Sequence, residues 1–493
     1  MSDLAARIAA GWAAPCRPWP RHVLDPAEWR AMAAALAGAP DVDLLAMWAD
    51  AQLVHALLHD RTGGAMLPVS VPTESGFYPA LSLARPPAAW FERMIRDLWG
   101  HHAEDGRDGR PWLDHGVWAL HAPLSARPVA VAGQPEPPEF FAPDGAGQTQ
   151  LALGPAGSGL GEPAALRLTL RGERVQRLEA RLGYAHKGTL ALLRGKSPRA
   201  AARFAARLAG DATVAHSIAF ARAAEEASGV VCPPRAAALR AAMAELERIA
   251  CHLSDLAATA EAAGLPAAAA SWLREGVARA AQAAFGHRLM MDFVLPGGVA
   301  SDMLVGGADA LAAVTRAVEM ALPDIADLFA PTTRLAGCGV LPTAVAQALA
   351  VGGVAGRASG VGGGRRRAMA DAPHLAEAPA PAAGDAAART AQRLAEINAS
   401  LAQLTRLLAA LPDGPLSVHL PPVGGEGIGW AEGARGDVWH WLRLEGGQIM
   451  AGFARDPGWL LWPALEAAAV GATLADLPLL LASFGATVSG MDL

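Results

Sequence analysis

The sequence predicts an α+β chain with two domains: a small α+β domain over residues 1–125 and a mainly helical domain with small β sheets over residues 148–493. A strand expected at 76–83 and a helix expected at 88–100 precede the stretch 126–147, whose proline, glycine and alanine content is typical of a linker. Helical periodicity dominates the later part of the chain. A length of 493 residues is sufficient for two such domains.

The helix expected at 88–100 has apolar side chains at helical spacing and charged side chains spaced for pairing. Its apolar positions are Trp90, Phe91, Met94, Leu98 and Trp99. Glu92 lies four residues before Arg96. Arg93 lies four residues before Asp97, so we expect two i,i+4 ion pairs on the surface of this helix.

The second domain is expected to open with strands at 166–170 and 174–180, which flank a tight turn. Its clearest helix is predicted over residues 234–263. This helix begins at a proline pair, where proline is tolerated, and it ends at Gly264, which can adopt the left-handed conformation of a helix cap.

A low-complexity segment at 355–388, rich in glycine, alanine and proline, predicts a long loop. An amphipathic helix is expected to follow at 387–411. Strands are then expected around Val418 and at 439–444 and 448–454.

Composition excludes several classes of protein. The hydrophobic content of 52% argues against disorder, and a net charge of −6 with a pI near 6.2 provides no basic field for nucleic acid. The four cysteines form no C-x-x-C pair, so neither a zinc module nor a disulfide framework is expected. No apolar stretch is long enough to span a bilayer and no signal peptide is recognised, so we expect any membrane contact to be made through partners.

Three segments of the second domain resemble one family. They are Gly183–Gly188 (GYAHKG), Arg207–Ala212 (RLAGDA) and Glu245–Leu253 (ELERIACHL). They are similar to motifs of the [NiFe]-hydrogenase large subunit and of the quinone-site subunit of complex I. The segment Trp90–Gly100 with the loop Asp108–Leu113 is similar to the small hydrophilic subunit of complex I that docks on that quinone-site subunit. A fusion of the two subunits is typical of formate-hydrogenlyase and hydrogenase-4 complexes.

The resemblance implies that the nickel ligands are absent. In nickel hydrogenases two cysteine pairs hold the metal, and here the corresponding positions are Ala209, Ala212, Thr487 and Gly490. Nickel and iron in such a centre need soft thiolate ligands, which hard oxygen ligands cannot replace. We therefore expect no metal in this chain.

The quinone site implied by the resemblance is also altered. The histidine, tyrosine and aspartate that the complex I subunit uses near quinone correspond here to Gly157, Gly210 and Ala262. A histidine pair near the terminal iron–sulfur cluster corresponds to Met290 and Met291. Reduction of a quinone needs a proton donor at its oxygen, and these replacements carry no titratable proton.

Polar landmarks of the family remain, and two interpretations of them stay open. The functional interpretation is a residual cleft that faces a partner's iron–sulfur cluster. Its candidate residues are His186, Lys187, Arg207, Arg357 and Arg435. The structural interpretation is that such groups form buried ion pairs that specify the fold. A structural polar network is expected from Glu245, Arg248, His252 and Asp302. No catalytic residue can be assigned.

The resemblance predicts a subunit of a membrane-associated complex of the NADH-quinone oxidoreductase and hydrogenase-4 type. Its expected partners are a small subunit that holds a [4Fe–4S] cluster and antiporter-like membrane subunits, and it would lie on the cytoplasmic face of the membrane. We expect no cofactor in this chain and a structural or coupling role. One alternative is a nickel-free scaffold for hydrogenase assembly, and another is a quinone-reducing subunit with a rewired site.

Overall fold

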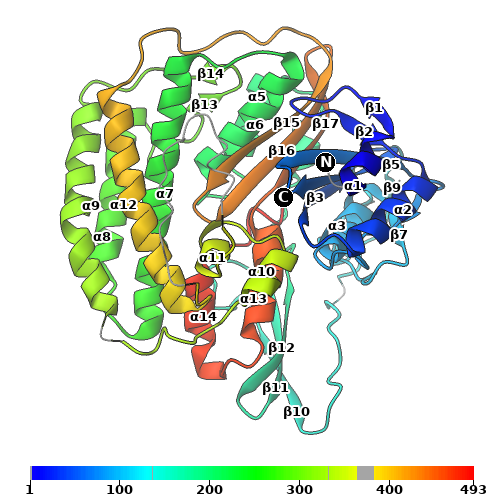
Figure 1. Cartoon of the computed structure of the whole chain (residues 1–493), viewed down its shortest axis with the longest axis horizontal. Helices are drawn as coiled ribbons and strands as arrows, with labels where there is room; N and C mark the ends of the chain where they lie inside the picture. Colours follow the sequence, from blue (N-terminus) through cyan, green and yellow to red (C-terminus); the bar gives the residue numbers. More distant parts are fainter. Residues whose placement is uncertain (1–2, 136, 331, 363–381) are drawn as a thin grey trace.

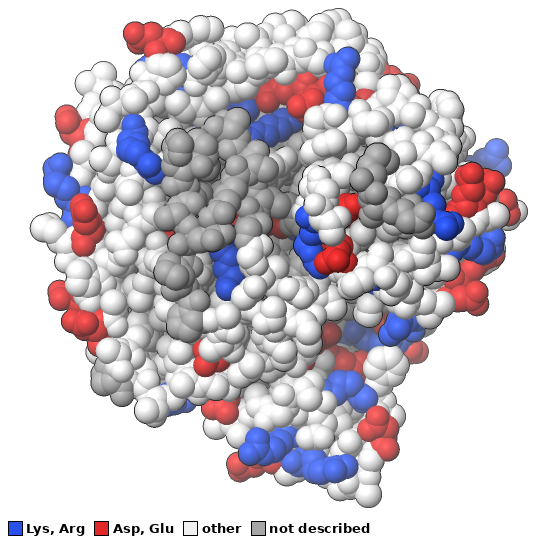
Figure 2. Space-filling view, viewed as in Figure 1, with Lys and Arg blue, Asp and Glu red and all other residues white. Residues whose placement is uncertain are grey.

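The computed structural model describes residues 3–135, 137–330, 332–362 and 382–493. It is the α+β architecture that the sequence predicts, with sheets near the N-terminus followed by a helical region with small sheets (Figure 1). Most of the face seen in Figure 2 carries neither acidic nor basic side chains, in keeping with a charged content of 18%. Within the described ranges, no helix combines the length and the apolarity needed to cross a membrane.

The N-terminal region is built on a five-stranded sheet with the order β1-β2-β5-β4-β3, in which only β2 and β5 pair in parallel. The strands are β1 Trp12–Ala14, β2 Arg21–Val23, β3 Val42–Ala49, β4 Leu53–Asp60 and β5 Ala65–Pro72. All eight residues of β3 are buried. A strand buried on both faces shows no alternation of apolar and polar residues, so its sequence gives no period-two signal.

Three helices accompany this sheet: α1 Asp3–Ala9, α2 Pro26–Ala37 and α3 Ala88–Trp99. Helix α2 begins with a capping box, in which Asp25 accepts the Glu28 N–H and the Glu28 side chain accepts the Asp25 N–H. Short pairs follow, β6 Phe77–Pro79 with β7 His102–Glu104 and β8 Leu120–His121 with β9 Val129–Ala130. The strand expected at 76–83 is therefore only β6.

The ion pairs predicted within α3 are wrong, because nearly the whole helix is buried and its charges hold neighbouring loops. Glu92 accepts the N–H groups of Leu81 and Ser82. Arg93 pairs with Asp108 at 3.3 Å. The other two charged residues also turn away from the predicted partners: Arg96 pairs with its neighbour Asp97, whose second oxygen accepts the Trp112 N–H at 2.7 Å.

The later region combines two three-stranded antiparallel sheets with a helical bundle (Figure 1). The strands are β10 Gln148–Leu153, β11 Ala165–Arg171, β12 Arg174–Arg181, β13 Val294–Leu295, β14 Gly298–Val299, β15 Gly425–Gly433, β16 Gly436–Glu445 and β17 Gln448–Arg455. The helices are α4 Thr189–Leu193, α5 Pro198–Ala205, α6 Thr213–Ser228, α7 Pro234–Ala263, α8 Ala268–Phe285, α9 Gly307–Phe329, α10 Thr343–Ala348, α11 Gly353–Ala358, α12 Ala386–Ala409, α13 Gly458–Ala469 and α14 Leu477–Phe484, with a 3₁₀ turn at Leu474–Asp476.

Several predicted elements are confirmed and two are corrected. Helix α7 has the predicted bounds, and Gly264 caps it in the left-handed conformation. The segment around Val418 is not a strand, since the chain there forms a single bridge between Ser417 and Gly298. Part of the low-complexity loop predicted at 355–388, residues 363–381, lies outside the described residues; of the rest, residues 355–358 belong to α11 and residues 386–388 to α12.

Strand β15 lies directly against helix α6 because every second residue of its first half is glycine. A Cβ atom added at Gly425, Gly427 or Gly429 would lie 2.1–2.3 Å from a backbone oxygen of α6. All three positions are on one face of the strand, so the face toward the helix carries no side chains there. This close contact fixes α6 over the sheet that supports the candidate site.

The N-terminal sheet and the β15–β17 sheet share one hydrophobic core. Trp48 of β3 stacks on Phe453 with ring centroids 5.4 Å apart and contacts Trp441 at 5.8 Å. Polar contacts cross the same boundary: the Arg455 Nε–H donates to the Leu45 carbonyl at 2.8 Å. Unfolding of the N-terminal region would therefore expose apolar surface on that region and on the β15–β17 sheet.

Candidate functional site

The two segments that correspond to cysteine pairs in the resembling family meet in the structure. Ala209 and Ala212 lie in the turn that joins α5 to α6, and Thr487 and Gly490 lie after α14. The Thr487 hydroxyl donates to the Asp211 carboxylate at 3.4 Å, which places the two segments in contact. The site is therefore assembled, but none of its four positions carries a sulfur atom.

An ionic cluster surrounds this junction. Arg435, in the turn between β15 and β16, donates to Asp211 and to Asp255 of α7, the latter at 2.8 Å. Arg393 of α12 pairs with the same Asp255 at 3.2 Å. Burial raises the pKa of Asp255 to about 6, although Arg393 opposes the shift. Burial also lowers the pKa of Arg435 to about 10, which leaves it charged near neutral pH.

A second buried group fills the space behind Gly490. The His216 imidazole lies 3.0 Å from His440 and 3.2 Å from Asp456, and all three residues are at most 4% exposed. A Cβ atom added at Gly490 would lie 2.3 Å from the Asp456 carboxylate oxygen. The space that a side chain at position 490 needs is therefore occupied by Asp456.

His186 and Lys187 bind the C-terminal segment. The His186 Nδ1 atom lies 2.6 Å from the Asp492 carbonyl, and Lys187 donates to the Ser489 carbonyl at 2.7 Å. The Asp492 carboxylate accepts the N–H groups of Gly183 and Ala185, both at 2.7 Å. Burial raises the pKa of Asp492 to about 6. These contacts close the chain end over the junction.

Arg357 belongs to a different part of the same interior. It bridges Glu396 of α12 and Glu432 of β15 at 2.7 and 2.6 Å. Glu396 also lies 3.0 Å from the His252 Nε2 atom and 3.8 Å from Arg248. Burial acts to raise the pKa of Glu396, but Arg357 and His252 outweigh it and hold that pKa well below its ordinary value.

The structure brings some of the sequence-predicted residues together and separates others. Arg248 contacts Glu245 at 3.7 Å, so these two join the Glu396 group. Asp302 lies elsewhere and pairs with Arg235 at 2.8 Å. Arg207 forms a surface pair with Asp292, in which both side chains are nearly half exposed.

The donor atoms near the junction do not match a nickel–iron centre. Cys251, on α7, is the cysteine nearest in sequence to Asp255, and burial together with Asp255 and Glu247 raises the pKa of its thiol well above the ordinary value. A neutral thiol is a poor metal ligand. Among the described residues, no three histidine, cysteine, aspartate or glutamate side chains are grouped as a metal site.

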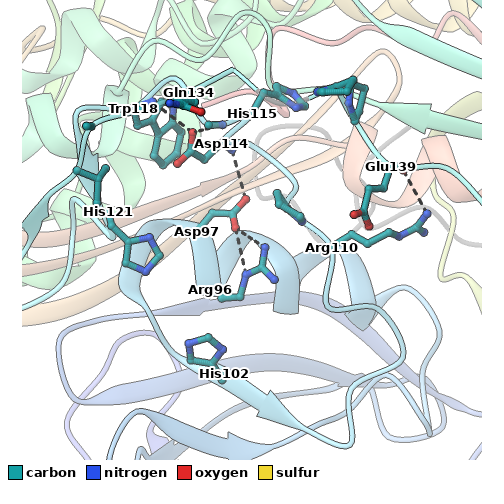
Figure 3. Close-up of a pocket in the computed structure, with 17 residues that line it drawn as sticks. Arg96, Asp97, His102, Arg110, Asp114, His115, Trp118, His121, Gln134 and Glu139 are labelled. Carbon is teal, nitrogen blue, oxygen red and sulfur yellow. Dashed lines mark hydrogen bonds and ion pairs between the residues drawn. The ribbon is translucent and has the colours of Figure 1, made fainter.

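Two cavities lie beside the site. One of about 650 Å³ is formed by α3 and the following loops, and Figure 3 shows that Arg96, Asp97 and Asp114 line it. Its arginines are already paired, Arg96 with Asp97 and Arg110 with Asp108. The second cavity, of about 280 Å³, is apolar. Trp118 and His186 both line it, and the centroids of their rings lie 4.7 Å apart.

Sequence reasoning missed the partners that make up the site. They are Asp211, His216, Asp255, Arg393, Glu396, His440 and Asp456. One signal was available: Asp255 follows His252 by three residues, and Glu396 follows Arg393 by three, so each pair lies on one helix face. That spacing suggests one polar face on each helix but not which helices would meet.

Comparisons with known proteins match this chain to one family. Residues 266–424 match the family described as respiratory-chain NADH dehydrogenase, 49 Kd subunit. The chain is 30% identical to an NADH-quinone oxidoreductase subunit of Salinispora tropica over 299 residues, which cover 57% of this chain and 76% of that protein. It is 26% identical to formate hydrogenlyase subunit 5 of Escherichia coli, over 86% of this chain and 78% of that protein.

A solved structure has the same fold. It is a chain of the membrane-bound sulfane sulfur reductase, an archaeal respiratory membrane complex, with a TM-score of 0.65 and 24% identity. The match covers 71% of this chain and all of that chain. At this identity the likeness establishes the fold alone.

Proposed function

The chain belongs to the family of the complex I 49 kDa subunit and the [NiFe]-hydrogenase large subunit, and from this premise we propose that it is a subunit of a membrane-bound respiratory complex of the complex I and hydrogenase-4 type. In this role it packs on a small subunit that holds a [4Fe–4S] cluster and is joined to the membrane through antiporter-like subunits. It contributes structure or conformational coupling rather than a redox centre of its own.

The extent of the similarity supports a fusion of two subunits. The match to formate hydrogenlyase subunit 5 covers 86% of this chain, which is more than the part after residue 147 can supply. The N-terminal region is therefore included in it. A docking region held in the same chain favours membership of a complex over a role as an assembly scaffold, which has no evident need of it.

The single observation that carries the proposal is the composition of the junction. Thiolates are absent from its four ligand positions, and the space at Gly490 is filled by the Asp456 carboxylate. Arg435 and two aspartates form a closed ionic cluster beside it. These groups support a chain without nickel. The neighbouring surface pair of Arg207 and Asp292 is exposed, as contact with an iron–sulfur subunit would require.

The test is purification from the membrane of the source cells through a tag on this chain, followed by metal analysis and identification of the partners. We expect iron and acid-labile sulfide, no nickel, and co-purifying antiporter-like subunits. Stoichiometric nickel in this chain would overturn the assignment of the junction. Recovery of the chain only with hydrogenase maturation factors would instead establish the scaffold alternative.

A second candidate function rests on the apolar cavity beside His186. Its volume of about 280 Å³ and its apolar wall suit a hydrophobic ring system, and His186 provides a polar group at its edge. Quinone reduction at a rewired site is the function that this cavity favours. A photoreactive quinone analogue should then label the wall near Trp118, with less labelling in Trp118→Ala than in the wild type; labelling elsewhere would exclude this candidate.

A further inference from the structure

A set of buried polar side chains lies in the interior between helices α7 and α12. We call it the polar seam, and it consists of Arg248, His252 and Asp255 of α7 with Gln392, Arg393, Glu396 and Ser400 of α12. Each of these residues is at most 6% exposed. On α7 they are spaced by four and three residues, and on α12 Gln392, Glu396 and Ser400 are spaced by four with Arg393 beside them, which places them on the facing sides of the two helices. A helix interface in a protein core is normally apolar, so this one requires an explanation.

The outer end of the polar seam opens on a small cavity at the N-terminal sheet. This cavity, of about 70 Å³, is lined by His59 and Arg61 of the sheet region and by Arg357 and Glu432. The side chains of His59, Arg61 and Arg357 are 20–27% exposed, so solvent reaches them. Arg357 in turn contacts Glu396 at 2.7 Å, which joins the cavity to the seam.

The inner end of the polar seam is the ionic cluster at the junction. Asp255 contacts both Arg393 and Arg435, and Arg435 contacts Asp211. Between the two ends, the charge of Arg393 contributes to the lowering of the His252 pKa, so these two side chains lie within electrostatic reach of each other. The seam thus links a solvated cavity to a carboxylate deep in the protein.

Several polar atoms in the seam have no protein partner. They are the His252 Nδ1, Gln392 Oε1, Arg393 Nη1 and Ser400 Oγ atoms of the seam and the Arg435 Nε atom of the ionic cluster at its inner end, each buried and without a hydrogen bond to any described residue. Buried polar groups in native proteins are almost always hydrogen-bonded, to protein or to ordered water. A run of such atoms along one interface, with both donors and acceptors, matches the two to four contacts that a buried water molecule makes.

We propose that the polar seam holds bound water molecules and conducts protons between the cavity at His59 and Asp255. His252 is the relay: its Nε2–H donates to Glu396, and its Nδ1 faces the seam as an acceptor. A proton received at Nδ1 from water is matched by one released at Nε2 to Glu396 or to water. One proton enters and one leaves, and no electron moves. This path belongs to the chain itself and goes beyond its proposed membership of a complex.

The experiment measures hydrogen–deuterium exchange of buried carboxylic acids by infrared spectroscopy in the purified full-length chain at pH 5. Burial raises the pKa of Asp255 to about 6 and that of Glu466 to about 7, so both are protonated at this pH. Asp255→Asn and Glu466→Gln assign the two bands. Glu466 is an internal reference, because its desolvated carboxyl group lies outside the seam and accepts the Ala180 N–H. If the seam is hydrated, the carboxylic acid proton of Asp255 should exchange at least about tenfold faster than that of Glu466, because exchange at Glu466 requires local opening of the structure.

Gln392→Leu removes the polar end of a seam residue with little change in size. It should slow the exchange of Asp255 by about tenfold and leave Glu466 unchanged, since water then loses a contact within the path. Thr390→Val is the matched control, because this buried hydroxyl on the same helix donates only to its own helix at Ala386. It should alter neither rate.

Three results would overturn the proposal. Exchange of Asp255 that is as slow as that of Glu466 in the wild type would show that water does not reach it, and this comparison needs no folded variant. Unchanged exchange in folded Gln392→Leu would show that the path lies elsewhere. An experimental density map should also show water within hydrogen-bond distance of His252 Nδ1 and Gln392 Oε1, and a dry seam in such a map would contradict the proposal.

Discussion

Gly490→Ala tests whether Asp456 fills the space that a side chain at position 490 needs. The new Cβ atom would lie 2.3 Å from the Asp456 Oδ2 atom and 2.4 Å from its Cγ atom, so the carboxylate must move. It would then lose its contacts with His216 at 3.2 Å and with the Gly458 N–H at 2.7 Å. Each hydrogen bond to a charged group contributes about 1.5–3 kcal/mol, so we expect the free energy of unfolding to fall by about 3 kcal/mol or more.

A double-mutant cycle in urea separates this clash from other effects. With Asp456→Ala as the background, Gly490→Ala should cost less than about 0.5 kcal/mol, since the obstructing carboxylate is gone. Gly210→Ala is the matched control in the same site, because no atom lies within 4 Å of its added Cβ. Gly210→Ala should leave the free energy of unfolding unchanged or raise it by up to about 1 kcal/mol. Additive costs for the two substitutions, or a stable Gly490→Ala protein, would refute the geometry of the junction.

Three further outcomes are expected. Trp48→Ala should cost about 3–5 kcal/mol and still give one unfolding transition, because this side chain joins two sheets; a separate early transition would contradict a shared core. Burial raises the pKa of Glu466 from 4.5 to about 7, so its contribution to stability is complete below pH 4.5 and is lost as the pH rises through 7. The free energy of unfolding of Glu466→Gln relative to that of the wild type should therefore increase by up to about 3 kcal/mol between pH 4.5 and pH 8. An equal difference at the two pH values would contradict the raised pKa. Arg207→Ala should change the free energy of unfolding by less than about 1 kcal/mol, since its pair with Asp292 is exposed, yet weaken binding to the iron–sulfur subunit that we propose as its partner, as measured in a pull-down.

The elements that could be predicted from the sequence are those whose ends are marked by local chemistry. Helix α7 has a proline pair at its start and Gly264 at its end, and both bounds are as predicted. Helix α3 likewise ends at Gly100 in the left-handed conformation. The strands β11 and β12 follow from the turn at Gly172. In each case the signal lies within a few residues of the boundary.

The elements that escaped prediction depend on contacts made across the fold. The repeat of glycine at 425, 427 and 429 looks like a loop, yet it is the bare face of a strand that a helix covers. The charged residues of α3 have i,i+4 spacing, but burial directs them to loops that no local pattern identifies. Tertiary packing overrides local preference at both places.

The candidate site shows the same difference between residues that a local motif identifies and residues that only the tertiary fold brings into contact. Arg435 and Arg357 could be selected from motifs, but the carboxylates that neutralise them come from α7, α12 and β15, far away in the sequence. The sequence of a charged helix does not show which other helix it will pack against. The candidate residues were thus within reach of the sequence, and their partners were not.

The junction is occupied by an ionic cluster of two arginines and two aspartates, whose chemistry differs from that of a set of thiolate metal ligands. Two arginines, Arg393 and Arg435, pair with two aspartates, the buried Asp255 and the partly exposed Asp211, so the charges of these four side chains balance. Thiolates added at the four ligand positions would bring negative charges next to the buried Asp456 carboxylate, and burial would then favour their protonated form. A side chain at position 490 would also displace Asp456. Cysteines introduced at the four positions should therefore give a destabilised protein with neutral thiols, because they would compete with Asp456 for space and would add buried negative charge.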